Sequence, residues 1–176
     1  PRVAQAYVVR SYLAPEANPG DQKEAAALTV LAELLGGNAS TSLMARSMMF
    51  DTQVATYVAA QYDAISLDPT TFGLVVVPAE GVSLADAEKA MDACLARFLK
   101  EGVDKAEFDR IKAQLRAKQI YDEDNTQGAA HRYGMALTSG LTVQDVADWP
   151  KVLADVTPDD VMAAARKVLD PKTSVT

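Results

Sequence analysis

Leu-Leu-Gly-Gly-Asn-Ala-Ser-Thr-Ser-Leu, at residues 34–43, is the most informative stretch of this chain. It follows a run of strong helix formers and has the pattern of a helix end followed by the start of a second helix. Gly36 and Gly37 can adopt the left-handed conformation that ends a helix without a Cβ clash. Ser40 or Thr41 can then accept a backbone N–H at the start of the next helix. The stretch therefore predicts two helices in close succession.

The segments on either side alternate between strand and helix signals. Runs rich in β-branched and aromatic residues predict strands, at 3–13, 54–62, 72–77 and again after Pro171. Polar residues with capping spacing predict the starts of later helices, at Ser83, Asp104, Thr142 and Thr157. The Trp149-Pro150 pair is expected to interrupt the helix that follows Thr142, because proline removes a backbone hydrogen bond.

This order of elements predicts the fold class. A strand, two helices, a hairpin, several helices and a last strand favour an α+β fold, with an antiparallel or mixed few-stranded sheet and helices packed on one side. No repeat or linker divides the chain, so residues 1–176 are expected to form a single domain. The chain lacks an initiator methionine and both opens and stops at strand-like runs, so it is expected to be a fragment of a longer chain.

Composition excludes several classes of function. The chain has 17 basic and 24 acidic residues, a net charge of −7, and no basic run, which argues against nucleic acid as a partner. It has no apolar run of the roughly 20 residues that a membrane span needs. Cys94 is the only cysteine, so a disulfide within the chain is impossible, and we interpret it as a small buried apolar residue.

The sequence contains no self-contained active site. His131 is the only histidine, and no carboxylate stands four residues after it, so the paired histidines of a helical zinc site are absent. No serine lies in a Gly-x-Ser-x-Gly elbow, and no glycine-rich loop has the spacing of a phosphate cradle. We therefore expect neither a catalytic residue, nor a metal, nor a cofactor within this segment.

Several segments, taken in order, resemble the second half of bacterial insulinase and pitrilysin-like zinc metallopeptidases. They cover nearly the whole chain and include Arg10–Pro15, Leu34–Leu43, Val54–Val58, Asp68–Phe72, Gly140–Thr142 and Val156–Val161. In this family two similar α+β halves, of the kind found in mitochondrial processing peptidase, close like a clamshell around a chamber. The first half binds zinc through an inverted His-x-x-Glu-His helix, whereas the second half has no zinc.

The resemblance implies a function, partners and a location. The chain would be a non-catalytic domain that binds substrate and closes the chamber of a zinc metalloendopeptidase. Its partners would be a peptide substrate and the N-terminal half or partner subunit that binds the zinc, and the resemblance also allows a homodimer. Because bacterial relatives are often exported, it suggests a periplasmic location.

The resemblance also suggests two substrate-binding residues, Tyr57 and Arg46. Many members place an Arg and a Tyr seven positions apart after the Ser-Ser-x-Leu segment. Here Tyr57 stands near the expected Tyr, but Phe50 occupies the position seven residues earlier and the nearest arginine is Arg46. In the family, such side chains could stabilise a developing oxyanion. From the residues alone, Tyr57 is an ordinary strand aromatic and Arg46 an exposed helix residue.

Two other functions remain open at this point. The first is a catalytically silent structural or partner subunit with the same fold, which the altered Arg–Tyr spacing favours. The second is a free-standing domain that binds a small molecule, which would require a convergent polar pocket. Peptide cleavage by the full-length protein or its natural complex would separate the leading hypothesis from the silent subunit.

Overall fold

The computed structural model describes residues 5–123 and 125–176. Strands alternate with helices in the first half of the chain, and helices dominate the second half. In chain order the elements are β1 (Val8–Ala14), α1 (Lys23–Ala32), η1 (Glu33–Gly37), η2 (Ala45–Asp51), β2 (Ala55–Tyr62), β3 (Thr70–Pro78), α2 (Leu84–Glu101), α3 (Lys105–Glu123), α4 (Thr126–Thr138), α5 (Val143–Asp155), α6 (Pro158–Val168), η3 (Pro171–Thr173) and β4 (Ser174–Val175).

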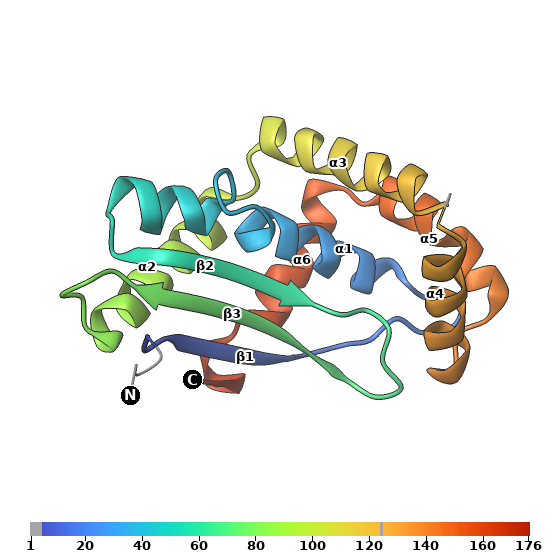
Figure 1. The fold of residues 1–176 in the computed structure, drawn as a ribbon, viewed down its shortest axis with the longest axis horizontal. Coiled ribbons are helices and arrows are strands. Elements are labelled where there is room, and N and C mark those ends of the chain that lie inside the picture. The colour runs from blue at the N-terminus through green and yellow to red at the C-terminus, as the bar shows by residue number, and fades with distance from the viewer. Residues whose placement is uncertain (1–4, 124) are drawn as a thin grey trace.

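The described strands form an antiparallel sheet in the order β2-β3-β1-β4. In Figure 1, α2 and α6 pass behind the strands, while α3, α4 and α5 form a second group of helices beyond α1. The α+β prediction, with an antiparallel sheet and helices on one side, is confirmed. Residues 3 and 4 of the predicted first strand lie outside the described residues, and β1 begins at Val8.

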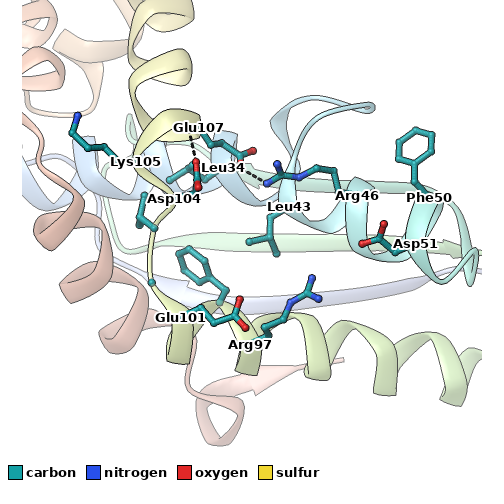
Figure 2. A pocket seen from close by; sticks show the side chains of 13 residues that line it. Leu34, Leu43, Arg46, Phe50, Asp51, Arg97, Glu101, Asp104, Lys105 and Glu107 are labelled. Atoms are coloured by element: carbon teal, nitrogen blue, oxygen red, sulfur yellow. Dashed lines mark hydrogen bonds and ion pairs between the residues drawn. The ribbon is translucent and has the colours of Figure 1, made fainter.

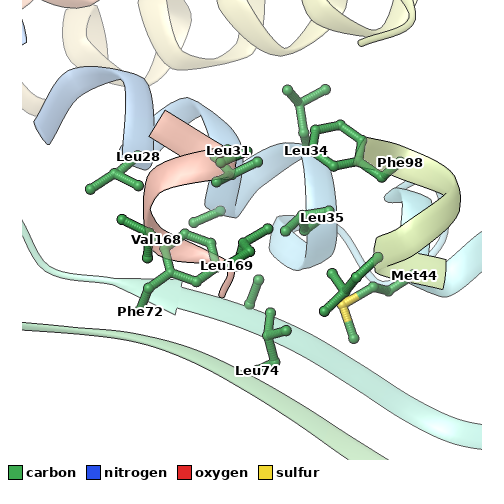
Figure 3. Close-up of a cluster of buried hydrophobic side chains, with 14 of the residues drawn as sticks. Leu28, Leu31, Leu34, Leu35, Met44, Phe72, Leu74, Phe98, Val168 and Leu169 are labelled. Atoms are coloured by element: carbon green, nitrogen blue, oxygen red, sulfur yellow. The ribbon is translucent and has the colours of Figure 1, made fainter. Parts of the chain in front are cut away.

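The core lies between the sheet and helices α1, α2 and α6, as Figure 3 shows. Leu28 and Leu31 from α1 contribute to the same buried cluster as Phe72 and Leu74 from β3, and all four are fully buried. Burial of one such side chain stabilises the fold by about 1.5–3 kcal/mol relative to leaving it exposed. Phe72 also stacks on Tyr62 of the neighbouring strand, with ring centroids 6.2 Å apart.

The two glycines of the 34–43 stretch do not act as predicted. The glycines with positive φ are Gly20, Gly81, Gly102 and Gly140, so the prediction of a left-handed stop at Gly36 and Gly37 is wrong. Both residues instead continue helix α1 as the π-helical turn η1.

Close packing explains the glycine at position 36. A Cβ added to Gly36 would lie 2.2 Å from the backbone nitrogen of Ala60 and 2.5 Å from the carbonyl carbon of Ala59, both in β2. Contacts between real Cβ atoms and other heavy atoms are essentially never shorter than 3.0 Å. The absence of a side chain therefore allows η1 to lie directly against the sheet backbone.

The cap before η2 also differs from the prediction. The start of η2 has no side-chain cap, so neither Ser40 nor Thr41 acts as predicted. Asn38 Oδ1 instead closes the turn before the helix, accepting the backbone N–H of Ser40 at 2.9 Å and that of Thr41 at 3.1 Å. The carbonyl group of the short Asn side chain competes well for backbone N–H groups two and three residues ahead. Thr41 Oγ1 instead accepts a hydrogen bond from Arg110 of α3 at 2.8 Å.

Most of the other helix starts are where the capping signals predict them. Ser83 Oγ accepts the N–H of Asp86, and Asp104 Oδ1 accepts that of Glu107 at 2.8 Å. Thr142 and Thr157 each form a complete capping box with the aspartate three residues later. The interruption expected at Trp149-Pro150 is wrong, because Pro150 lies inside the continuous helix α5. The strong cap and the buried Leu153 outweigh the one hydrogen bond that proline removes.

Asp160, at the start of α6, gives the fold a pH-dependent contribution. Its carboxylate pairs with Lys23 of α1 at 2.7 Å and accepts hydrogen bonds from Thr157 Oγ1 at 2.6 Å and Thr157 N at 2.9 Å. These contacts, the Lys23 ammonium first, lower the pKa of Asp160 from 3.8 to about 2. The charged carboxylate is therefore favoured in the folded state.

We expect Asp160→Asn to lower the free energy of unfolding at pH 7 by about 1–2 kcal/mol, allowing for solvent screening of a partly exposed pair. A depressed carboxyl pKa stabilises the fold above the unfolded pKa near 4, and this contribution disappears as the pH falls towards 2. Urea unfolding at pH 7 and at pH 2 measures both values. An equal deficit at the two pH values would contradict the assigned cause.

Candidate functional site

One face of the sheet is not covered by the described helices. In β1 and β3 alternate residues are buried, whereas the residues between them are partly or largely exposed. Leu13 is 66% exposed. Val175 of β4 pairs with Ser11 of β1, which places it on the same face, and it is 75% exposed. We call this surface the open sheet face; its apolar members are Val9, Leu13, Tyr57, Val75, Val77 and Val175.

Tyr57 projects from this face. It lies in β2 opposite Val77 of β3, and its side chain is 47% exposed. A bulge in β2 between Ala55 and Tyr57 sets the register that turns Tyr57 outward and Val58 into the core. A bulge of this kind redirects the side chains of a strand. The phenol hydroxyl is therefore available to a ligand that lies along the sheet.

A cavity lies on the helical side of the molecule. This cavity of about 720 Å³ is bounded by η2, by the end of α2 and by the start of α3 (Figure 2). Leu34, Leu43 and Phe98 provide apolar surface, and charged side chains surround it. In Figure 2, Arg46 reaches across from η2 towards Glu107, and Arg97 and Glu101 extend from α2.

Glu107 organises this cavity. Its carboxylate is only 5% exposed and is paired with Arg46 through Oε2 and with Arg110 at 3.3 Å through Oε1. Arg110 also donates to Thr41, so the group links η2, the turn at 38–41 and α3. A buried carboxylate requires such partners, because burying it unpaired is strongly unfavourable. The arrangement supports a structural role for Arg46.

The structure places the two predicted substrate-binding residues on different surfaces. Arg46 lines the cavity and is engaged by Glu107, whereas Tyr57 is not part of the cavity lining and projects from the open sheet face. Phe50, seven residues before Tyr57, also lines the cavity and is 55% exposed. For Glu107, the sequence indicated only a position in the first turn of a helix that Asp104 caps. Nothing in the local sequence indicated that Glu107 pairs with Arg46.

The remaining candidate side chains show ordinary environments. His131 is an exposed residue of α4, and Cys94 is buried in α2, where desolvation raises the pKa of its thiol. No cluster of three or more metal-ligating side chains occurs among the side chains of residues 5–121 and 125–176. Among the helices of the same described residues, none combines the length and apolar character that crossing a bilayer requires.

Comparison with solved structures relates this architecture to peptidases. The chain superposes on a protease from Helicobacter pylori with a TM-score of 0.87 and 20% identity, over 98% of this chain and 40% of that one. It superposes on the inactive peptidase domain of a candidate zinc protease from Bordetella parapertussis with a TM-score of 0.83 and 14% identity, over 99% and 90% of the two chains. The periplasmic protease PqqL from Escherichia coli gives 0.66 and 14%, over 96% and 18%.

The sequence itself matches a family model. No curated protein matches the chain. The chain spans about 40% of the length of the Helicobacter pylori protease, so it corresponds to one part of that protein. Residues 1–115 match the model of the peptidase M16 inactive domain, which is the zinc-less domain of the insulinase-like metallopeptidases. This chain therefore belongs to the peptidase M16 inactive domain family.

Proposed function

We propose that this chain binds peptide substrate and closes the chamber of a zinc metalloendopeptidase. The observation that carries the proposal is the open sheet face with Tyr57 on it. The solvent-facing side of an antiparallel sheet is normally polar, and a contiguous exposed apolar patch marks an interaction site. An extended peptide lying on this face would bury Leu13, Val75 and Val77.

Tyr57 is the polar group of this surface that is best suited to a peptide. Its hydroxyl both donates and accepts hydrogen bonds, and its aromatic ring stays in contact with the apolar strand surface. Facing a zinc site in another domain, the hydroxyl would donate to the carbonyl oxygen of the substrate or to the oxyanion that forms from it. The zinc and the groups that activate the attacking water would all belong to that other domain.

The proposal requires a zinc-bearing half outside residues 1–176. Membership of a zinc-less family and the 40% coverage of the Helicobacter pylori protease support the chain being one domain of a longer protein or complex. The zinc-bearing half would be N-terminal in that protein or a separate subunit. The structural likeness to a periplasmic protease supports a periplasmic location.

The test is peptide cleavage by the full-length gene product, alone or with a zinc-bearing subunit, on an unfolded reporter peptide. We expect cleavage that a zinc chelator abolishes and zinc restores. Tyr57→Phe is expected to lower kcat/KM about 10- to 100-fold, because it removes one hydroxyl from the substrate surface. Tyr121→Phe is the matched control, because Tyr121 is an exposed tyrosine of α3 away from the sheet.

The possible results separate clearly. Equal activity of the Tyr57→Phe variant and the wild-type protein would remove Tyr57 from the substrate site. Equal losses in the two tyrosine variants would point to a general loss of structure, which circular dichroism would detect. Cleavage that is insensitive to the chelator would contradict the zinc mechanism.

One observation favours a catalytically silent partner subunit as the second candidate. Arg46 is committed to Glu107, and Phe50 stands where many relatives carry the arginine that accompanies the tyrosine. In that case the open sheet face would contact a partner protein rather than a substrate. Absence of cleavage by the full-length gene product and by its purified natural complex would support this alternative.

A further inference from the structure

A groove with cationic walls runs between α3 and α5. Two hollows of about 300 and 600 Å³ lie side by side there and share Leu115, Gln119, Pro150 and Leu153 in their lining. The shared residues make the hollows one continuous depression, which we call the α3/α5 groove. Leu153 belongs to the buried core and Leu115 packs against it, so the base of the groove is apolar.

Among the side chains that the structure describes, residues 5–121 and 125–176, every charged one that lines the groove is a cation. These side chains are Lys112, Arg116, Lys118, Arg132 and Lys151. The chain as a whole has a net charge of −7, so this concentration of one sign is opposite to the overall balance. A concave surface lined by one sign of charge attracts ligands of the other sign.

The cations differ in their availability. Lys112 is occupied, because its Nζ donates to the carbonyl oxygens of Leu153 and Ala154 at 2.6 Å and of Val156 at 2.9 Å. Arg116 and Lys151, by contrast, make no ion pair or hydrogen bond with any described side chain. Asp155 and Asp160 lie close enough to Lys112 to affect its pKa, but neither lines the groove.

A buried donor lies where the two hollows meet. Gln119 Nε2 is buried and has no hydrogen-bond acceptor within residues 5–121 and 125–176, and Gln119 lines both hollows. Buried polar groups in folded proteins nearly always have a partner, and an unmade bond is costly. A carboxylate or carbonyl oxygen placed in the groove would supply the missing acceptor.

We propose that the α3/α5 groove binds an acidic amphipathic polypeptide segment of a partner protein. The apolar base suits leucine-like side chains, the free cations suit carboxylates, and Gln119 suits an additional oxygen. Lys112 and Gln119 are seven residues apart on α3, which is about 10 Å along the helix axis and matches two turns of a bound helix. The negative charge of the rest of the chain disfavours a nucleic acid as occupant.

The location of the groove makes this inference independent of the proposed peptidase function. The family model covers residues 1–115, so most of the groove lies beyond the matched region. It is also formed by helices, whereas Tyr57 projects from the sheet. Failure of peptide cleavage would therefore leave this proposal intact, and the reverse holds as well.

The test uses the full-length gene product and a fluorescein-labelled helical peptide of about 14 residues. In this peptide Leu residues spaced four apart form one helix face, and Glu residues spaced four apart form the neighbouring face. We expect saturable binding by fluorescence anisotropy at low salt, which weakens as salt is added. The double reversal Arg116→Glu with Lys151→Glu is expected to weaken binding at least about tenfold. The same peptide with Gln in place of Glu is expected to bind much more weakly.

A second double reversal controls for net charge. Lys89→Glu with Lys100→Glu changes two exposed lysines of α2 and alters the total charge equally. We expect this variant to bind like the wild-type protein. The proposal would be overturned if both double variants weakened peptide binding equally. It would also be overturned if the Gln peptide bound as tightly as the Glu peptide, or if the Glu peptide did not bind at all. Groove-dependent binding to phosphatidylglycerol vesicles without binding to the peptide would overturn it in favour of a membrane surface.

Discussion

Gly36→Ala is expected to destabilise the protein by at least about 3 kcal/mol, measured as the free energy of unfolding in urea by circular dichroism. The new Cβ would lie 2.2 Å from Ala60 N, and the atoms that it meets belong to the backbone of β2. A flexible side chain could rotate away, but a strand that is hydrogen-bonded to β3 cannot. The helix would have to move away from the sheet, and the buried side chains of Leu34 and Leu35 would lose part of their contacts with the core.

A second glycine provides the control for this prediction. Gly134 lies inside α4, and a Cβ added there meets no atom within 4 Å. Gly134→Ala is expected to stabilise the protein by about 0.5–1 kcal/mol, because alanine favours the helix. If both variants destabilise the protein to the same extent, the close contact with β2 is not the cause of the first effect.

Phe72→Ala is expected to lower the free energy of unfolding by about 3–5 kcal/mol, because it removes a fully buried aromatic ring at the centre of the sheet. The change also removes the stacking on Tyr62, which is partly buried and donates a 2.6 Å hydrogen bond to the Pro15 carbonyl. Thermal and urea unfolding both measure this loss. The cavity would lie where β2, β3 and the helical layer meet.

Two further variants test the origin of that loss. Phe72→Leu fills part of the cavity and is expected to cost clearly less than Phe72→Ala. Thr71→Ala changes the preceding residue, which is exposed on the other side of β3, and is expected to change the free energy of unfolding by no more than about 0.5 kcal/mol. A large effect of Thr71→Ala would show that this part of the strand is stabilised from the open sheet face.

Local signals in the sequence were sufficient for most of the fold. The hairpin of β2 and β3, the caps at Ser83 and Thr142 and the proline at the start of α6 depend on residues close together in the chain. The predictions that failed depend on tertiary contacts. Gly36 has the composition of a helix stop, and only the distance to β2 shows that it is a packing glycine. Pro150 likewise is tolerated inside a helix that other contacts hold in place.

The candidate site was only partly predictable for the same reason. The alternation in β2 could place Tyr57 on a strand, but which side of the sheet stays open depends on where the helices pack. From the sequence we interpret Arg46 as an exposed helix residue or a substrate-binding residue, whereas its pairing with Glu107 joins residues 61 positions apart. No local pattern encodes a contact of that separation. The cationic groove between α3 and α5 is likewise invisible in a chain whose overall charge is negative.

The position of β4 beside β1 has a consequence for biosynthesis. Ser11 pairs with Val175, and Arg10 Nε donates a 2.9 Å hydrogen bond to Thr176 Oγ1, 166 positions later in the chain, so β1 is completed only when this distant segment has been synthesised. Contacts of such long sequence separation form slowly, because a long loop must close first. Until then the outer edge of β1 has unpaired backbone groups that can pair with another chain. A nascent chain that has passed Pro78 can therefore form the β2-β3-β1 sheet, but the outer edge of β1 is covered at Ser11 and Tyr12 only after residues 174–175 have been added.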